Sequence, residues 1–107
     1  MSNILILDEY RKDITFALKQ RASLLDVLCN DSRDATAAEE KHLDDLEHAI
    51  ACGVPRNARE ANAQAALASE IWEVLNAGGA LPCGFFTAMD RASAAAASAR
   101  WFFRAAA

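Results

Sequence analysis

The chain has 107 residues, of which 53% are hydrophobic and 24% are charged, and its formal net charge is −4. These values fit one compact domain over residues 1–107, and they exclude a disordered tail, a collagen-like repeat and a second domain of ordinary size. Because 25 residues are alanine, which favours helix but buries little area, we expect a thin core that self-association would help to complete.

We expect the protein to be cytoplasmic. Residues 1–9 contain no basic leader and only four successive apolar residues before the first acid, too few for a signal peptide. The longest uncharged stretch of the last helical segment, 92–99, is far shorter than the roughly 20 residues that span a bilayer. Cys29, Cys52 and Cys83 form no CxxC pair, which favours a reducing compartment. The alanine content is compatible with a bacterial or phage source.

Helical periodicity recurs in four segments, and strand-like alternation is confined to the first few residues. The pattern predicts helices over 8–30, 36–52, 57–77 and 85–105. Short connections favour antiparallel neighbours. The expected fold is therefore all-α: a small antiparallel bundle of about four helices, completed by homodimerisation.

The first two helices have clear apolar stripes and ends. In the first, Ile14, Leu18 and Leu25 recur at helical spacing. In the second, Thr36 and the glutamate three residues later form a capping box. Gly53 is expected to end that helix in the left-handed conformation, and the proline two residues later prevents continuation.

The last two helices differ in the bulk of their stripes. Asn57 and Glu60 form a second capping box, and Leu67 and Ile71 lie on the apolar face that follows. The fourth helix has a stripe that is bulky at both ends and slim in the middle. Its members are Phe85, Met89, Ala92, Ala96, Ala99 and Phe103. The small side chains in the middle of this stripe would let another helix approach closely.

The second helix is strongly acidic. Residues 31–50 hold seven acidic and two basic residues. Five acids of the helix itself form what we call the acidic ridge: Glu39, Glu40, Asp44, Asp45 and Glu47. Such a surface repels nucleic acid and steers a basic partner. It is equally typical of a charged face that keeps an alanine-rich protein in solution.

The acidic segment contains two histidines whose spacing suggests a metal site but whose placement on a single helix is unfavourable for one. Glu39 with His42, and Asp45 with His48, have the Glu/Asp-x-x-His spacing of carboxylate-bridged di-metal bundles. In those bundles the pairs come from different helices, whereas here both lie in one, and His48 falls opposite the apolar stripe. We therefore predict surface histidines and no metal ligand.

Residues 49–59 resemble part of a DNA-reading helix-turn-helix. They contain the alanine, the turn glycine and the apolar residue after it, and Arg56, Asn57 and Arg59 could face phosphates or base edges. The match then fails, because Arg59 and Asn62 stand where a recognition helix turns apolar groups inward. A DNA-binding regulator centred on 49–62 is kept as an alternative.

The C-terminal aromatic cluster is the strongest sign of an interface. Three consecutive aromatics, Trp101, Phe102 and Phe103, span about 200° of a helix, so one neighbouring helix cannot bury them all. Phe86 shares a side with Trp101, and Trp72 also lies off the principal stripes. A monomer would leave an exposed apolar patch, and contiguous patches mark interaction sites.

The sequence therefore predicts a non-enzymatic protein–protein interaction module. We expect a small dimeric regulator that inhibits or sequesters a partner protein, as an inhibitor or anti-activator does; an adaptor or secretion chaperone is a further alternative. The aromatic cluster would form the partner or dimer contact, and the acidic ridge would attract a basic surface. We predict no catalytic residue, cofactor or metal, and neither nucleic acid nor membrane as partner. Cys83 precedes a helix but has no nearby His or Asp to act as a base.

Overall fold

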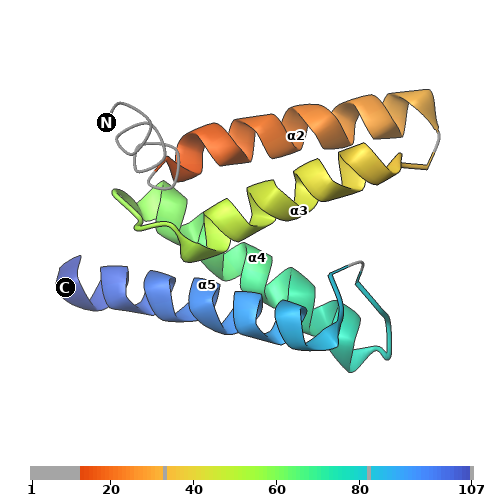
Figure 1. The fold of residues 1–107 in the computed structure, drawn as a ribbon. Helices are drawn as coiled ribbons and strands as arrows, with labels where there is room; N and C mark the ends of the chain where they lie inside the picture. The colour runs from red at the N-terminus through yellow and green to blue at the C-terminus, as the bar shows by residue number, and fades with distance from the viewer. Residues whose placement is uncertain (1–12, 33, 82, 107) are drawn as a thin grey trace, which may run out of the picture.

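The computed structural model describes residues 13–32, 34–81 and 83–106. Within these ranges the protein contains four helices and no strand: α2 (Ile14–Asp31), α3 (Ala37–Cys52), α4 (Ala58–Asn76) and α5 (Phe85–Ala106). Figure 1 shows their arrangement. The helices pack into one compact globule, so the predicted all-α fold is confirmed. Antiparallel pairing and the dimer remain predictions. None of the described helices is long and apolar enough to cross a lipid bilayer.

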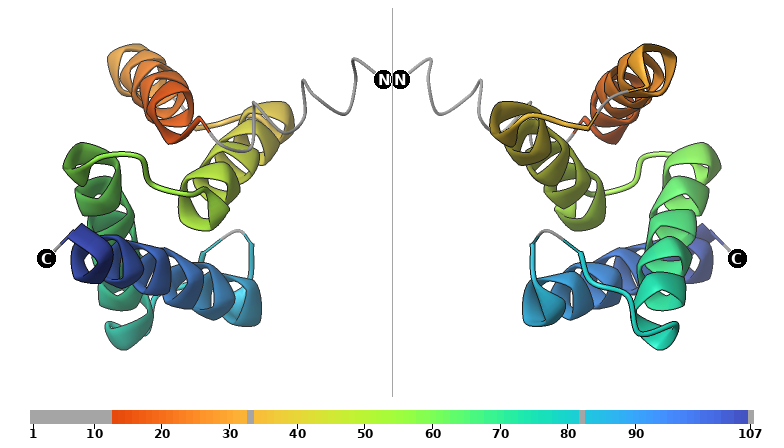
Figure 2. Two further views of the ribbon diagram at one scale, coloured as in Figure 1. Left: turned by 90° about the vertical axis from the view of Figure 1, so that its left-hand side faces the viewer. Right: turned by 90° about the vertical axis from the view of Figure 1, so that its right-hand side faces the viewer.

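The helices form two pairs joined through α3. α4 and α5 share the most extensive contact, α2 packs on α3, and α3 also contacts α4 and α5. In Figures 1 and 2, α2 lies on the side of α3 that faces away from α5. This position leaves the later part of α2 poorly covered. Ile14 and Ala17 are buried, whereas Leu25 of the predicted stripe is 39% exposed.

The predicted helix boundaries agree closely with the structure except at the start of the first helix. α2 begins at Ile14, because the Asp13 carboxylate caps it by accepting from the backbone N–H of Phe16; residues 8–12 of the predicted helix lie outside the described residues. The Thr36–Glu39 capping box is confirmed. The second box is half correct. Asn57 caps α4 as predicted, but the Glu60 carboxylate turns elsewhere.

The predicted left-handed conformation of Gly53 is wrong. Its φ is −74° and its ψ is 161°, which is extended backbone. Glycine is needed there for close approach, because an added Cβ would lie 2.6 Å from Ile14 Cγ1 and 2.9 Å from the Ala49 carbonyl oxygen. The carbonyls at the end of α3 are bound by the buried Gln64 side chain, whose Nε2 donates to the oxygens of Ile50, at 3.0 Å, and Gly53, at 2.8 Å.

The predicted stripe of α5 is also only partly correct. Its buried face comprises Ala88, Arg91, Ala92, Ala95 and Ala99. Ala92 and Ala99 were expected there, but Phe85 and Phe103 are 56% and 42% exposed. α4 contributes the small side chains Ala61 and Ala68 to the core, so the close approach of α4 and α5 leaves no room for a phenyl ring between them. The bulk of the core comes instead from the other helices, through Ile14, Leu46, Ile50, Leu67 and Ile71.

The close approach at Gly53 predicts an overpacking penalty. Gly53→Ala should lower the free energy of unfolding by about 1–3 kcal/mol, because the new methyl group must displace Ile14 or the end of α3. Urea unfolding measures the change. In a double-mutant cycle with Ile14→Ala, the two effects should be less than additive, since both act on one contact. An unchanged unfolding midpoint in Gly53→Ala would contradict the packing described.

Candidate functional site

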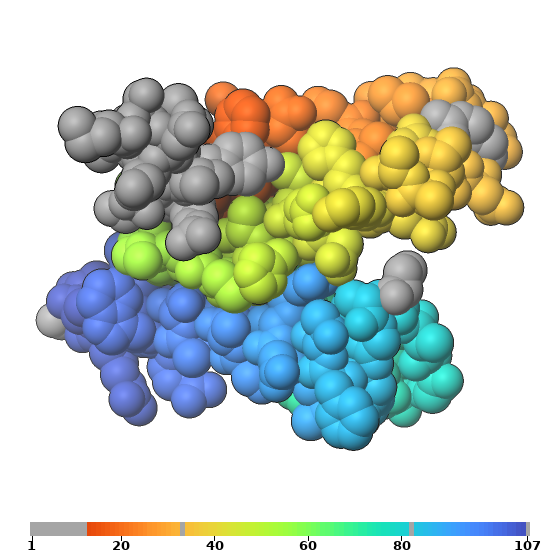
Figure 3. Space-filling model, viewed as in Figure 1, coloured from red at the N-terminus to blue at the C-terminus, as the bar shows by residue number. Residues whose placement is uncertain are grey.

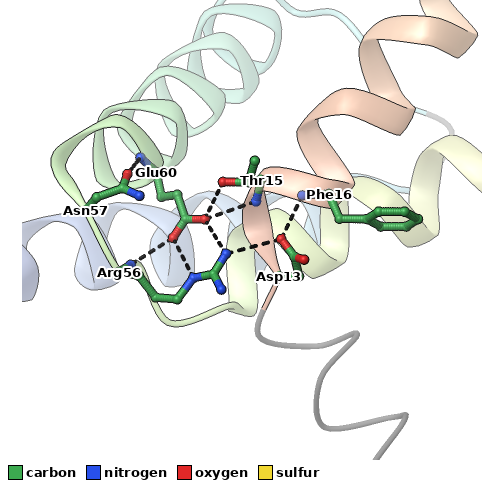
Figure 4. Close-up of polar contacts among 6 residues, drawn as sticks. All are labelled: Asp13, Thr15, Phe16, Arg56, Asn57 and Glu60. Atoms are coloured by element: carbon green, nitrogen blue, oxygen red, sulfur yellow. Dashed lines mark hydrogen bonds and ion pairs between the residues drawn. The ribbon is translucent and has the colours of Figure 1, made fainter.

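A buried carboxylate joins the beginnings of α2 and α4 (Figure 4). Glu60 has no exposed surface. Its Oε2 accepts hydrogen bonds from the Thr15 hydroxyl at 2.6 Å and the Thr15 backbone N–H at 3.1 Å. Arg56 donates to the same carboxylate from its backbone N–H, at 2.8 Å, and from its guanidinium, at 3.0 Å, and it also reaches Asp13 at 3.2 Å. We call Asp13, Thr15, Arg56 and Glu60 the polar hub.

The polar hub keeps Glu60 ionised. Burial by itself would raise the pKa of this carboxyl, but the hydrogen bonds from Arg56 and Thr15 outweigh it and lower the pKa to about 2. The same contact with Glu60 raises the pKa of Arg56 above its ordinary value. Glu60 is fully buried and binds Thr15 of α2, so its carboxylate links α4 to α2.

The polar hub also bears on the helix-turn-helix resemblance. Arg56, which would face DNA in that alternative, donates to Glu60 and Asp13 instead. Arg59 and Asn62 are exposed. The basic surface available around the α3–α4 connection is therefore smaller than the sequence suggests.

Of the five aromatic side chains predicted as an interface, four lie in α5 and Trp72 lies in α4, and they differ in exposure. Phe86 is 80% exposed and Trp101 is 59% exposed. Phe85 lies edge-on to Phe86, and Phe103 edge-on to Phe102, with ring centroids 5.5 Å apart in each pair. We call the four exposed rings, Phe85, Phe86, Trp101 and Phe103, the aromatic face.

Two of the predicted interface residues are less available than expected. Phe102 is half-buried. Trp72 is also half-buried, because it packs against the core. These two side chains contribute less accessible surface than the aromatic face does.

Members of the acidic ridge differ in how strongly they are engaged within the chain. Glu39 belongs to the capping box, and Asp45 pairs with Lys41 at 3.3 Å on the exposed side. Asp44 accepts a hydrogen bond from the guanidinium of Arg91 at 2.9 Å. Arg91 belongs to α5, and its side chain is 95% buried. Glu47 accepts from Arg21 of α2 at 3.0 Å, and Glu40 is exposed.

Three of these acids line an apolar groove. The groove has a volume of about 250 Å³ and receives residues from all four described helices and from the α4–α5 connection. Its apolar lining consists of Leu43, Leu67, Ile71, Val74 and Leu81, with Cys83 beside them. Its charged lining consists of Arg21, Glu40, Asp44, Glu47, Glu70 and Arg91. Figure 3 shows the surface hollowed between α3 and the beginning of α5. We call this site the acidic groove.

Sequence reasoning missed three charged members of the acidic groove as well as its apolar lining. Arg21, Glu70 and Arg91 belong to helices other than α3, and only the fold brings them to the acidic ridge. Arg21 joins Glu47 and Glu70, with N···O distances of 3.0 and 3.4 Å. One signal was present in the sequence: Arg91 sits at a core-facing position of a helix otherwise lined with alanine, where an arginine requires a carboxylate partner.

The side chains that could bind a metal lie apart from one another within the described residues. Among them, no three His, Cys, Asp or Glu side chains gather closely enough to hold a metal ion. His42 and His48 are both exposed, and His48 Nδ1 lies 3.8 Å from the Cys52 sulfur. The Cys83 sulfur lies 3.7 Å from the Gly84 carbonyl oxygen and lines the acidic groove.

Comparison with known proteins gives no relative: no family model, curated protein or solved structure matches the chain. Function must therefore be inferred from the chemistry of the acidic groove and the aromatic face.

The lowered pKa of Glu60 predicts how stability depends on pH. As pH falls from about 5 toward 2, the unfolded state, with a carboxyl pKa near 4.5, binds the proton before the folded state does. The contribution of Glu60, up to about 3 kcal/mol, is therefore present above pH 5 and lost across this range. Glu60→Gln should be less stable at pH 7 and less sensitive to acid.

Urea unfolding at pH 7, 5, 4 and 3 measures this dependence. The matched control is Glu73→Gln, since Glu73 is exposed on the same helix; its pH dependence should follow that of the wild type. Parallel curves for the wild type and Glu60→Gln would mean that Glu60 is not the titrating group.

Proposed function

We propose that this protein is a small non-enzymatic regulator that binds a basic partner protein through the acidic groove and so inhibits or sequesters it. We also propose that it acts as a homodimer of antiparallel helical bundles in the cytoplasm. The observation that carries the proposal is the convergence of Glu40, Asp44 and Glu47 with Glu70 around one apolar groove.

The charge balance of the acidic groove favours a cationic ligand. Four carboxylates line it against two guanidinium groups. Arg21 and Arg91 are already paired with acids, so they offer little to an anion. Within the described residues the Glu40 carboxylate has no hydrogen-bond or ion-pair partner, and the Glu70 carboxylate, which Arg21 contacts at 3.4 Å, is 60% exposed. These two carboxylates are the groups available to a lysine or arginine of the partner.

The size of the acidic groove favours an anchoring side chain over a whole small molecule. Its volume of about 250 Å³ lies below the roughly 300–1,000 Å³ typical of ligand pockets. A leucine or aromatic side chain inserted against Ile71 and Val74, with basic neighbours over Glu40 and Glu70, would use both the apolar and the acidic lining. Such apolar anchors in desolvated pockets carry most of the binding energy in protein interfaces.

The DNA-binding alternative centred on 49–62 has weaker support. Arg56 is engaged in the polar hub, and the preceding helix carries the acidic ridge. A duplex would meet repulsion from α3 beside any contact made by Arg59. The adaptor or chaperone alternative uses the same groove chemistry and differs only in what binding does to the partner.

Cross-linking from within the acidic groove tests the proposed function. A photoreactive phenylalanine replaces Val74, which lines the groove, or Ala66, which is exposed elsewhere on α4, in the native host. We expect a cross-linked polypeptide from position 74 and not from position 66, with the linkage in a segment rich in lysine or arginine.

Charge reversal then tests the acidic lining with the identified partner. Glu40→Lys should weaken binding roughly fivefold, because it removes a pairing carboxylate and adds repulsion. Glu73→Lys changes the net charge equally but lies outside the groove, so it should have a smaller effect. Equal effects of the two variants, or a partner segment without basic residues, would refute the proposed groove recognition.

A further inference from the structure

The two ends of α5 present shapes of opposite kind. Near its beginning, Phe86 projects with 80% of its surface exposed. Near its end lies a shallow apolar hollow of about 340 Å³. Its lining residues are Val54, Pro55, Ala97, Ser98 and Trp101. A projecting phenyl ring and an apolar hollow are complementary, but within one copy they are too far apart to meet.

The projection and the hollow lie on the same side of the helix. Phe86 and Trp101 are 15 residues apart, which is about 22 Å along an α-helix, and their directions differ by only about 60°. The exposed residues between them include Ser93 and Ala97. Small side chains at the centre allow a second helix to come close, while the bulky groups at the ends need a partner.

We propose that a second copy of this chain packs its α5 across this side, antiparallel, with a two-fold axis near Ser93 and Ala94. The axis lies midway between Phe86 and Trp101, so each Phe86 enters the hollow beside the other copy's Trp101. Because the two-fold axis makes the two contacts equivalent, both hollows are filled at once. The result is a closed dimer and not an open fibre. The inference rests on the homodimer of the proposed function and deepens it; it is independent of the acidic groove.

Charge complementarity supports this arrangement. Asp90 and Arg100 are exposed, and neither has an ion-pair partner within the described residues. With the axis between residues 93 and 94, Asp90 of one copy stands opposite Ala97 of the other. Arg100 of that other copy is then three residues away, about 4.5 Å along the axis. The two-fold axis makes two such opposite-charge neighbours. In a parallel pair, each of these charged residues would instead lie beside the same residue of the other copy, which has the same charge.

Val54 and Pro55 broaden the contact beyond one helix. Both belong to the α3–α4 connection, and Val54 is 54% exposed. Phe86 of the second copy would therefore be enclosed between two segments instead of lying on one helix face. The hollow shares no residue with the acidic groove, so the proposed dimer contact does not use the lining of that groove.

Sedimentation of matched variants tests the dimer. Ala97→Glu sets a carboxylate in the centre of the contact and should weaken dimerisation at least tenfold. Ala66→Glu makes the same change at an exposed position of α4 and should leave it unaltered. Phe86→Ala and Trp101→Ala should each weaken the dimer, and the double variant should weaken it by less than the product of the two effects, because both remove one contact.

Disulfide cross-linking tests the antiparallel geometry. In a background with Cys29→Ser, Cys52→Ser and Cys83→Ala, Ser93→Cys should cross-link two copies under mild oxidation, because residue 93 lies beside the axis. Ala97→Cys should cross-link far less, since its two copies would be about 10 Å apart along the axis.

Each outcome decides the inference. A monomeric wild type at high micromolar concentration overturns it and the homodimer together, without touching the groove proposal. A dimer that resists Ala97→Glu, or that cross-links equally through residues 93 and 97, overturns the α5 contact alone. Circular dichroism of every variant distinguishes a lost contact from a lost fold.

Discussion

The alanine face of α5 is the constraint on which the rest of the structure depends. Ala88, Ala92, Ala95 and Ala99 are buried against the rest of the protein, with Arg91 the single large side chain among them. Methyl groups let α4 approach closely, and this approach leaves no space for rings between the two helices. The large side chains of α5 therefore lie elsewhere, and the aromatic face is a direct consequence of how α5 packs.

A core with so little bulk from one helix relies on polar contacts to hold the others in place. Glu60 binds the beginning of α2 and Gln64 binds the end of α3. Arg91 binds Asp44, which also belongs to α3. Two of these side chains come from α4 and one from α5. The α4–α5 pair thus carries the buried polar groups that fix α2 and α3. Losing one partner of such a contact costs more than the contact contributes, because the other group stays buried.

How far the sequence predicts this structure depends on the range of the interactions involved. Local signals were sufficient for the helix ends at Thr36 and Asn57, because a capping side chain binds the backbone within three residues. They failed at Gly53, where the space for a side chain is limited by Ile14, 39 positions earlier. The stripe of α5 failed for a related reason. Periodicity alone gives two apolar faces to a helix that has alanine on most sides, and the neighbouring helices α4 and α3 decide which one is buried.

The candidate site was predicted in part for the same reason. Glu40, Asp44 and Glu47 were identified because they share one helix, but their apolar neighbours come mostly from α4 and the α4–α5 connection. The separation of the two candidate surfaces has a functional consequence. A two-fold dimer through α5 would carry two accessible acidic grooves on one particle, and a partner with two basic segments, or a dimeric partner, would bind the second groove at high effective concentration. Modest affinity at each groove of 250 Å³ would then be enough for sequestration. Under the proposed arrangement the thin alanine-rich core makes bivalent binding possible, because it leaves α5 with an exposed outer face that a second copy would cover.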